Sequence, residues 1–308
     1  MSTDLYFIGS GLSAPVGIAM SENYIYVVNQ TANTVTRYNL DGTGFISLIS
    51  SRLISPTGIA VSENYIYVTN SLASDNTSNT VSRYNLDGTG FTSIISSGLN
   101  NPQGIAVNAS YIYVTNSVNN TISRYNLDGT GFSIFITGLN NPKGIAINEN
   151  SIYVVNQFGN NVTQYNLNNG DFVRSISGLY FPFGIAIYGG KIYITNNNNI
   201  TQCNLDGSDP TTIITNTNLL RGIAVNANYI YISNIYAGSV GDNTVSRYNF
   251  NSTQPQLTTI ISNSGLIAPY DIAINANKIY VTIPSTNRVN RYNLDGTVRW
   301  NRIHKSYK

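Results

Sequence analysis

The sequence predicts an all-β protein, a seven-bladed β-propeller with four antiparallel strands in each blade. Three observations support this prediction. One motif returns seven times, at intervals of 38–49 residues. Each interval holds four short segments rich in Val, Ile, Thr, Tyr and Phe, which favour strands. Several of the segments are almost continuously apolar, so both faces of each sheet must be covered, as they are when blades stack around an axis. The motif glycines are Gly17, Gly58, Gly104, Gly144, Gly184 and Gly222, and Asp271 takes the seventh place.

The second repeat shows the expected elements in order. GIAV at 58–61 is the first strand, YIYVTN at 65–70 is the second, and NTVSRYNL at 79–86 is the third. The Asp-Gly turn at 87–90 is typical of a hairpin with positive backbone angles, and FTSIISSGL at 91–99 is the fourth strand. No apolar period of 3.6 residues runs far enough to predict a helix.

The repeats predict one domain over residues 1–297, followed by a basic tail or final edge strand at 298–308. The repeats begin near residues 11, 52, 97, 137, 177, 215 and 264. Residues 5–12, LYFIGSGL, match the fourth-strand segment of the other repeats. We therefore expect the N-terminal segment to supply the outer strand of the seventh blade and close the ring. The competing interpretation gives that strand to residues 298–303.

Three repeat families share motifs with this chain. IYVTNSVNNTISRYNLDGTG at 112–131 resembles the YVTN-type propeller repeats of bacterial and archaeal surface proteins. GLNNPQGIAV at 98–107 is similar to NHL repeats. NLDGT is similar to YWTD repeats, although Val-Thr or Val-Val replaces the Trp-Asp pair. The resemblance covers essentially the whole chain and implies a propeller, a fold that hosts many functions.

The composition narrows the setting in which the protein works. Charged residues make up 10 % of the chain, against roughly 25 % in ordinary soluble domains, and about one residue in seven is Asn. We find no apolar run long enough for a membrane helix and no signal peptide in MSTDLYFIGSGL. We therefore expect a cytoplasmic or particle-associated protein, viral particles included, rather than a secreted one. The single cysteine, Cys203, excludes an internal disulfide and a thiolate zinc cluster.

The tail at 298–308 is basic, whereas the rest of the chain is slightly acidic. Without its four Lys and Arg residues the body holds 12 basic and 14 acidic residues, so it lacks the basic character expected of a nucleic-acid-binding body. The tail residues that could anchor the chain to an acidic partner or a membrane surface are Arg299, Trp300, Arg302 and Lys305. The alternative is a solvated end or an extra edge strand.

The residue before each motif glycine varies from repeat to repeat, whereas its neighbours stay constant. In a propeller this position faces the mouth of the central channel, where ligands usually bind. The seven residues are Val16, Thr57, Gln103, Lys143, Phe183, Arg221 and Tyr270. We name Gln103, Lys143, Phe183, Arg221, Tyr270 and Asp271 as the candidate binding face, with Asp75 and Asp242 in two inserted loops at 71–79 and 235–243. The alternative is tolerated variation around a plugged or water-filled channel.

Two other recurring polar positions favour structural roles. Asn ends the second strand in six repeats, at Asn29, Asn70, Asn116, Asn156, Asn196 and Asn234, and we expect each side chain to cap its own turn. The alternative is a polar ring that binds a glycan or a peptide. Arg recurs in the third strand at Arg37, Arg83, Arg124, Arg247 and Arg291. We expect each to satisfy a carboxylate or carbonyl of the neighbouring blade rather than to form a basic stripe.

The distribution of acidic residues argues against an enzyme. Only Asp75, Asp242 and Asp271 can reach the mouth face, and only Asp271 lies near the axis. Propellers of the gluconolactonase and paraoxonase type hold a metal near the axis with carboxylates and Asn, and hard cations need several oxygen ligands. Lyases of the virginiamycin type resemble this chain in blade number and use a histidine base, but His304 in the tail is the only histidine.

We therefore expect a non-catalytic protein-interaction or structural propeller with no cofactor and no metal. Its expected partner is another protein or a surface or particle assembly. A glycan-binding propeller is one alternative. A metal-assisted hydrolase or lyase of the lactonase or virginiamycin-lyase type is the other.

Overall fold

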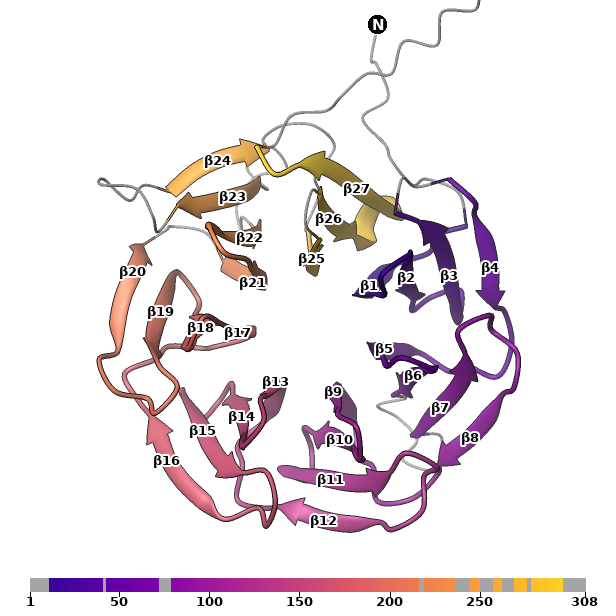
Figure 1. Cartoon of the computed structure of the whole chain (residues 1–308), viewed down its shortest axis with the longest axis horizontal. Coiled ribbons are helices and arrows are strands. Elements are labelled where there is room, and N and C mark those ends of the chain that lie inside the picture. The colour runs from indigo at the N-terminus through magenta and orange to yellow at the C-terminus, as the bar shows by residue number, and fades with distance from the viewer. Residues whose placement is uncertain are drawn as a thin grey trace, which may run out of the picture.

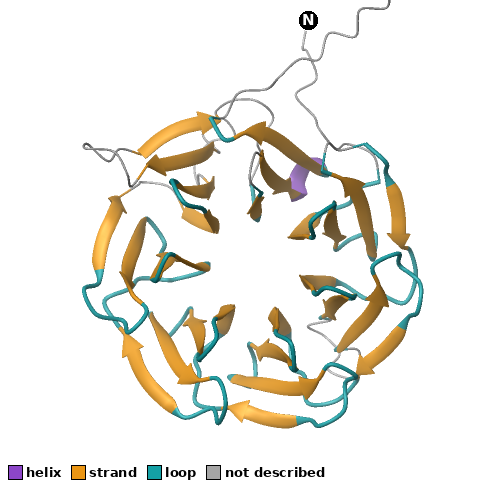
Figure 2. Cartoon of the chain, viewed as in Figure 1, coloured by secondary structure: helices purple, strands orange, loops and turns teal. Residues whose placement is uncertain are grey.

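The computed structural model describes residues 11–40, 43–71, 79–215, 219–235, 244–249, 257–261, 269–275 and 278–295. Seven antiparallel sheets surround a central axis, which confirms the predicted seven-bladed β-propeller (Figure 1). Six sheets have four strands in sequence order, and the seventh has three within the described ranges. Strands and short loops make up nearly all of the drawn ribbon (Figure 2).

In each blade the first strand lies nearest the axis and the later strands follow outward, as far as a fourth strand in six blades and a third in the described part of the seventh (Figure 1). The first strands are β1 (Pro15–Met20), β5 (Pro56–Val61), β9 (Pro102–Val107), β13 (Pro142–Ile147), β17 (Ile185–Tyr188), β21 (Leu219–Val225) and β25 (Ile272–Ile274). The second strands are β2 (Tyr24–Asn29), β6 (Tyr65–Asn70), β10 (Tyr111–Asn116), β14 (Ser151–Asn156), β18 (Lys191–Thr195), β22 (Tyr229–Ile235) and β26 (Lys278–Ile283). The third strands are β3 (Thr34–Asn39), β7 (Thr80–Asn85), β11 (Thr121–Asn126), β15 (Asn161–Asn166), β19 (Asn199–Asn204), β23 (Thr244–Asn249) and β27 (Arg288–Asn293). The fourth strands are β4 (Ile46–Ile49), β8 (Thr92–Ile95), β12 (Ser133–Ile136), β16 (Phe172–Ile176), β20 (Thr211–Thr215) and β24 (Leu257–Ile261).

The hydrophobic core lies between blades. On β6, Ile66 and Val68 pack toward the first blade, whereas Tyr67 packs toward the third blade. Successive strand residues point to opposite faces of a sheet, so each blade has two apolar faces and needs two neighbours. This arrangement confirms that the continuous apolar runs of the second strands are covered on both sides.

The motif glycines allow the inner strands to approach one another. A Cβ on Gly104 would lie 2.5 Å from the backbone oxygen of Lys143 in the next blade, and one on Gly58 would lie 2.6 Å from that of Gln103. Such separations are too short for a side-chain carbon, so only glycine fits without a backbone shift. The recurrence of glycine therefore follows from the spacing of the blades.

Polar contacts also cross the seams between blades. Arg37 donates to the backbone oxygen of Leu86, and Arg83 donates to that of Leu127. Arg124 and Arg291 donate in the same way, so the four recurring arginines with described side chains bind carbonyls of the next blade, as predicted. The fourth blade has Gln164 at the arginine position. There the hydroxyl of Tyr153, on the second strand, donates to the backbone oxygen of Leu205 in the next blade at 2.8 Å.

Five of the recurring asparagines have described side chains, and all five are buried and structural, as expected, but their partners differ from the prediction. These are Asn29, Asn70, Asn116, Asn156 and Asn196. The Asn70 oxygen accepts the Ile54 N–H at 3.1 Å, and its amide nitrogen donates to Thr80 and Ser82. The side chain therefore joins the loop before the first strand to the third strand, rather than capping its own turn. Buried amides need partners for both ends of the group, and at Asn70 this bridging position supplies them.

The Asp-Gly turns also differ in detail from the prediction. Gly88 has a positive φ of 82°, as expected, but Asp87 does not adopt the positive φ of a type I′ turn. Its carboxylate instead accepts the N–H of Thr89 at 2.9 Å and the hydroxyl of the same residue at 2.6 Å. The aspartate thus stabilises the turn through its side chain.

The ring closes between the seventh blade and the first. The Tyr280 hydroxyl donates to the Leu40 oxygen at 2.7 Å, the Ala14 N–H donates to the Asn287 side chain, and Leu12 is buried against Tyr280. The two expected closing strands, from residues 5–12 and 298–303, lie outside the described residues except for 11 and 12, as does the domain boundary at 297. Within the described ranges, no helix is long and apolar enough to cross a membrane.

Candidate functional site

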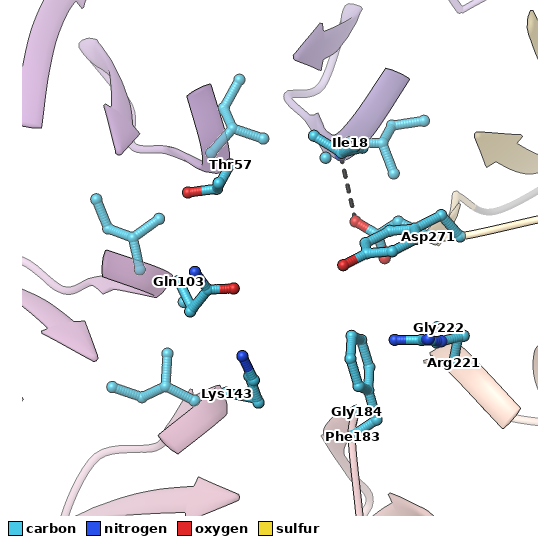
Figure 3. A pocket seen from close by; sticks show the side chains of 18 of the residues that line it. Ile18, Thr57, Gln103, Lys143, Phe183, Gly184, Arg221, Gly222 and Asp271 are labelled. Atoms are coloured by element: carbon cyan, nitrogen blue, oxygen red, sulfur yellow. Dashed lines mark hydrogen bonds between the residues drawn. The ribbon is translucent and has the colours of Figure 1, made fainter. Parts of the chain in front are cut away.

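The first strands surround a central cavity of about 730 Å³. All seven variable residues predicted to face the channel mouth line this cavity, and Asp271 lies among them. Loop residues such as Gln30, Ser55 and Ser71, which precede a first strand or follow a second strand, also line it. The cavity therefore opens on the face that the sequence predicts to be the mouth. Figure 3 shows Gln103 and Lys143 pointing into it from neighbouring blades, across from Phe183, Arg221 and Asp271.

A β-bulge positions most of the variable residues. The pairing of β1 with β2 shifts between Pro15 and Gly17, and the shift recurs around the variable positions of β5, β9, β13 and β21. A bulged residue is not paired with the neighbouring strand, and bulges often redirect a side chain beside a functional site. The variable side chains can therefore change without altering the strand register.

A hydroxyl on the second strand accepts the backbone N–H that the bulge leaves unpaired. Thr115 accepts the N–H of Gly104 at 2.8 Å and donates to the backbone oxygen of Lys143 at 3.2 Å. Thr69, Thr195, Ser233 and Thr282 accept the equivalent N–H groups in their own blades. Sequence reasoning missed this role of the Thr or Ser before the strand-ending Asn, because its partners lie eleven residues back and in the next blade.

One side of the cavity carries two cations and two aromatic rings. The Arg221 guanidinium lies 4.4 Å from the ring centroid of Phe183 and 5.6 Å from that of Tyr270. The two rings meet edge to face with their centroids 6.0 Å apart. Burial lowers the pKa of Lys143, and the positive charge of Arg221 lowers it further. Within the described ranges, neither cation donates to a side chain or backbone oxygen, and neither forms an ion pair.

The other side of the cavity is uncharged and held by internal contacts. Thr57 donates to the backbone oxygen of Pro102 at 3.0 Å, and the Gln103 amide donates to the side chain of Asn101 at 2.9 Å. Val16 completes this side. The charged groups that could hold a ligand are therefore concentrated on blades four, six and seven.

Asp271 occupies the glycine position of the seventh blade. Its carboxylate accepts the Ile18 N–H at 3.3 Å and the Ile272 N–H at 2.9 Å (Figure 3). The residue as a whole is half-buried, but protein surrounds its carboxyl group. This burial raises the pKa of Asp271 to about 6, although the two N–H donors act in the opposite direction. Among the described residues that line the cavity, Asp271 is the one carboxylate, and none is a histidine.

The remaining predicted site residues lie outside the described part of the chain. These are Asp75, Asp242, Arg299, Trp300, Arg302 and Lys305, together with most of the two inserted loops. Among the residues that the structure describes, no group of three or more His, Cys, Asp or Glu side chains could hold a metal ion.

An exposed aromatic cluster beside the cavity was not predicted. It consists of Phe158, Tyr180 and Phe181, which are 56 %, 59 % and 43 % exposed, and we call it the aromatic patch. The Phe158 and Phe181 centroids lie 5.7 Å apart, and those of Tyr180 and Phe181 lie 5.9 Å apart. The sequence holds a signal for it, because GLYFPFG at 178–184 replaces the GLNNPQG and GLNNPKG of the two preceding repeats.

The aromatic patch lies on the face where the cavity opens. Phe158 sits in the loop between Asn156 and Asn161, which pair at the same blade edge as the start of β13. The Phe181 N–H donates to the Asn160 side chain at 2.8 Å, which joins the two loops of the patch. Phe183, two residues further on, lines the cavity. The patch and the charged side of the cavity are therefore continuous along one segment.

Comparisons with known proteins support the fold. No family model matches the chain, and no curated protein matches its sequence. Among solved structures, a streptogramin B lyase is 17 % identical with a TM-score of 0.77, covering 93 % of this chain and 95 % of its own. A catalytically inactive His-to-Ala variant of virginiamycin B lyase from Staphylococcus aureus, solved with quinupristin, is 17 % identical with a TM-score of 0.74, covering 92 % and 96 %.

A third similar structure is hydrazine synthase of Kuenenia stuttgartiensis, at 17 % identity and a TM-score of 0.73, covering 93 % of this chain and 97 % of its own. At these identities the similarity concerns the fold alone. The resemblance to YVTN-type and NHL repeats stays a prediction from the motifs. The chain is thus a seven-bladed β-propeller, with the variable residues of its repeats gathered in one central cavity.

Proposed function

We propose that the protein is a non-catalytic interaction propeller that binds another protein through the face on which the central cavity opens. One observation carries this proposal. The repeats differ at the position before the motif glycine, and all seven residues at that position line one cavity. The constant positions account for blade packing, so the varied ones are available for recognition.

The chemistry of the cavity favours binding over catalysis. General acid–base catalysis near neutral pH commonly uses a histidine or a tuned pair of carboxylates. The lining that the structure describes offers Asp271 alone, and two backbone N–H groups already hold its carboxylate. The lyase alternative rests on similarity of fold. The virginiamycin B lyase variant described as inactive has one histidine replaced by Ala, and the described cavity lining here contains no histidine.

The proposal is tested by comparing matched charge reversals on the two faces. Lys143→Glu with Arg221→Glu alters the cavity, whereas Glu63→Lys with Glu149→Lys alters exposed turns on the opposite face. Each purified protein is used to capture partners from an extract of the native source, and captured proteins are re-tested in purified form. We expect binding that the cavity variant loses and the opposite-face variant keeps. Equal binding by both variants would contradict the proposal.

A further inference from the structure

We propose that the partner inserts an acidic side chain into the cavity, where Lys143 and Arg221 bind its carboxylate, and rests a neighbouring apolar side chain on the aromatic patch. This inference depends on the proposed function, because it specifies the chemistry of the bound protein segment. It assigns a ligand class to the cavity and a role to the exposed aromatic rings beside it.

The charges of Lys143 and Arg221 favour the binding of an anion in the cavity. Lys143 and Arg221 are partly withdrawn from water, they repel each other, and neither has an anionic partner within the described ranges. Withdrawing a charge from water is costly unless an opposite charge or hydrogen bonds compensate. A carboxylate in the cavity would relieve both the desolvation and the repulsion. The one carboxylate in the described part of the lining, Asp271, is bound to the N–H groups of Ile18 and Ile272.

Arg221 is prepared for such a ligand. Its guanidinium lies over the rings of Phe183 and Tyr270, and these contacts limit the conformations of the Arg221 side chain. A planar guanidinium that stacks on aromatic rings still presents a fork of N–H donors suited to a carboxylate. Because the group is ordered before binding, less conformational entropy is lost when the ligand arrives.

The aromatic patch indicates that the ligand extends beyond the cavity. A small anion could bind in the cavity without touching Phe158, Tyr180 or Phe181, which lie outside its lining. The rings are exposed and tilted by 57° and 59° to one another. Such a cluster presents ring edges and hollows rather than one flat platform, so it fits an aliphatic or aromatic side chain better than a sugar ring. Aromatic side chains of this kind are common anchors at protein interfaces.

The repeats themselves provide variants that should keep the fold. Lys143→Gln copies Gln103, which holds the same position in the third blade, and Arg221→Gln extends this change to the other cation. Tyr180→Asn with Phe181→Asn copies the Asn-Asn pair at 140–141, and Asn141 has the same positive φ as Phe181, 51° against 50°. Glu63→Lys with Glu149→Lys serves as the opposite-face control.

The experiment selects peptides from a random phage-displayed library on the full chain. Recovered peptides are synthesised, and their Kd values are measured by fluorescence polarisation on the wild type and the variants. We expect Asp or Glu next to a large apolar residue. Affinity should fall at least tenfold on Lys143→Gln/Arg221→Gln, several-fold on Tyr180→Asn/Phe181→Asn, and not at all on the control.

A second comparison isolates the carboxylate. Replacing the peptide's Glu by Gln should weaken binding to the wild type at least tenfold, but should have little further effect on Lys143→Gln/Arg221→Gln. Coupling of this kind identifies a direct interaction. Peptides that lack an acidic residue yet bind the cavity face would overturn the carboxylate inference and leave the proposed function intact.

The remaining outcomes separate the two proposals. If no recovered peptide is sensitive to either mouth-face variant, both the inference and the proposed function are contradicted. Oligosaccharides with and without glucuronate are measured in parallel on the same variants. Binding of the glucuronate forms that depends on Lys143 and Arg221, without any such peptide, would overturn the protein partner in favour of an acidic glycan.

Discussion

The Asp271 carboxylate accepts a hydrogen bond from the backbone N–H of Ile18 and so joins the last blade to the first. Six other blades place glycine at the position of Asp271. This seam is therefore the one among the seven where a carboxyl group replaces close backbone contact. Its protonation should influence the stability of the ring.

The pH dependence of stability should change when Asp271 is replaced by Asn. Because the folded pKa of about 6 exceeds the ordinary value of 3.8, the folded state binds the proton more tightly than the unfolded state does. The stabilisation is fully present below about pH 4 and is lost as the pH rises through 6. The wild type should lose about 1–3 kcal/mol relative to Asp271→Asn between pH 4 and pH 7, the lower figure allowing for solvent screening of a half-buried residue.

Chemical denaturation of both proteins at several pH values measures this difference. The other carboxylates are common to both proteins, so their contributions cancel in the comparison. A difference in unfolding free energy that stays constant from pH 4 to pH 8 would show that Asp271 has an ordinary pKa in the folded protein.

Replacement of the motif glycines by Ala should have effects that follow the spacing of neighbouring blades. In Gly104→Ala the new Cβ would meet the Lys143 backbone oxygen at 2.5 Å, whereas in Gly17→Ala it would meet the Thr57 oxygen at 3.2 Å. We expect Gly104→Ala to lower the unfolding free energy by about 2–4 kcal/mol and Gly17→Ala by about 1 kcal/mol or less. Urea denaturation tests the order, and equal losses would count against the close approach.

Thr115→Val should destabilise the protein by leaving the bulge N–H without a partner. The substitution removes the acceptor of the Gly104 N–H and the donor to the Lys143 oxygen. An unsatisfied buried polar group costs about 1–3 kcal/mol. The matched change is Val155→Thr, which introduces a hydroxyl at the same position of the fourth blade. It should be neutral or stabilising, and a loss as large as that of Thr115→Val would contradict the role of the hydroxyl.

Cys203 should be inert in the folded protein. Its thiol is buried, and desolvation raises its pKa to about 11. The thiolate is the reactive form, and at pH 8 it would make up about one part in a thousand at that pKa. A thiol reagent such as Ellman's should therefore label the chain only after denaturant is added. Rapid labelling of the native protein would place Cys203 at the surface.

Several features were predictable because they depend on residues close together in the sequence. The spacing of Gly58, Gly104 and Gly144 predicts the blades, and the variation just before each glycine predicts which side chains reach the cavity. The prediction that Asn70 caps its own turn was wrong. Its side chain instead bonds the third strand and a loop sixteen residues earlier, which come together only in the folded blade.

Other features require the folded chain. In the sequence Thr115 is one of many strand-forming residues. Its hydrogen bond with the Gly104 N–H depends on the bulge, which forms only in the folded blade. Phe158 and Phe181 are 23 residues apart, and their contact depends on how two loops of adjacent blades meet. That Lys143 and Arg221 lack an anionic partner is visible only when the whole described lining of the cavity is known.

The bulged position in the first strand has a consequence for how such a chain can evolve. A residue outside the strand pairing can be exchanged without moving its neighbours, and its blade keeps the hydroxyl and glycine that hold the backbone. Duplication of a blade therefore copies a stable unit together with one site that is free to diverge. Mutation can give a lineage of such proteins new binding preferences one residue at a time, while selection for folding acts on the rest of the repeat.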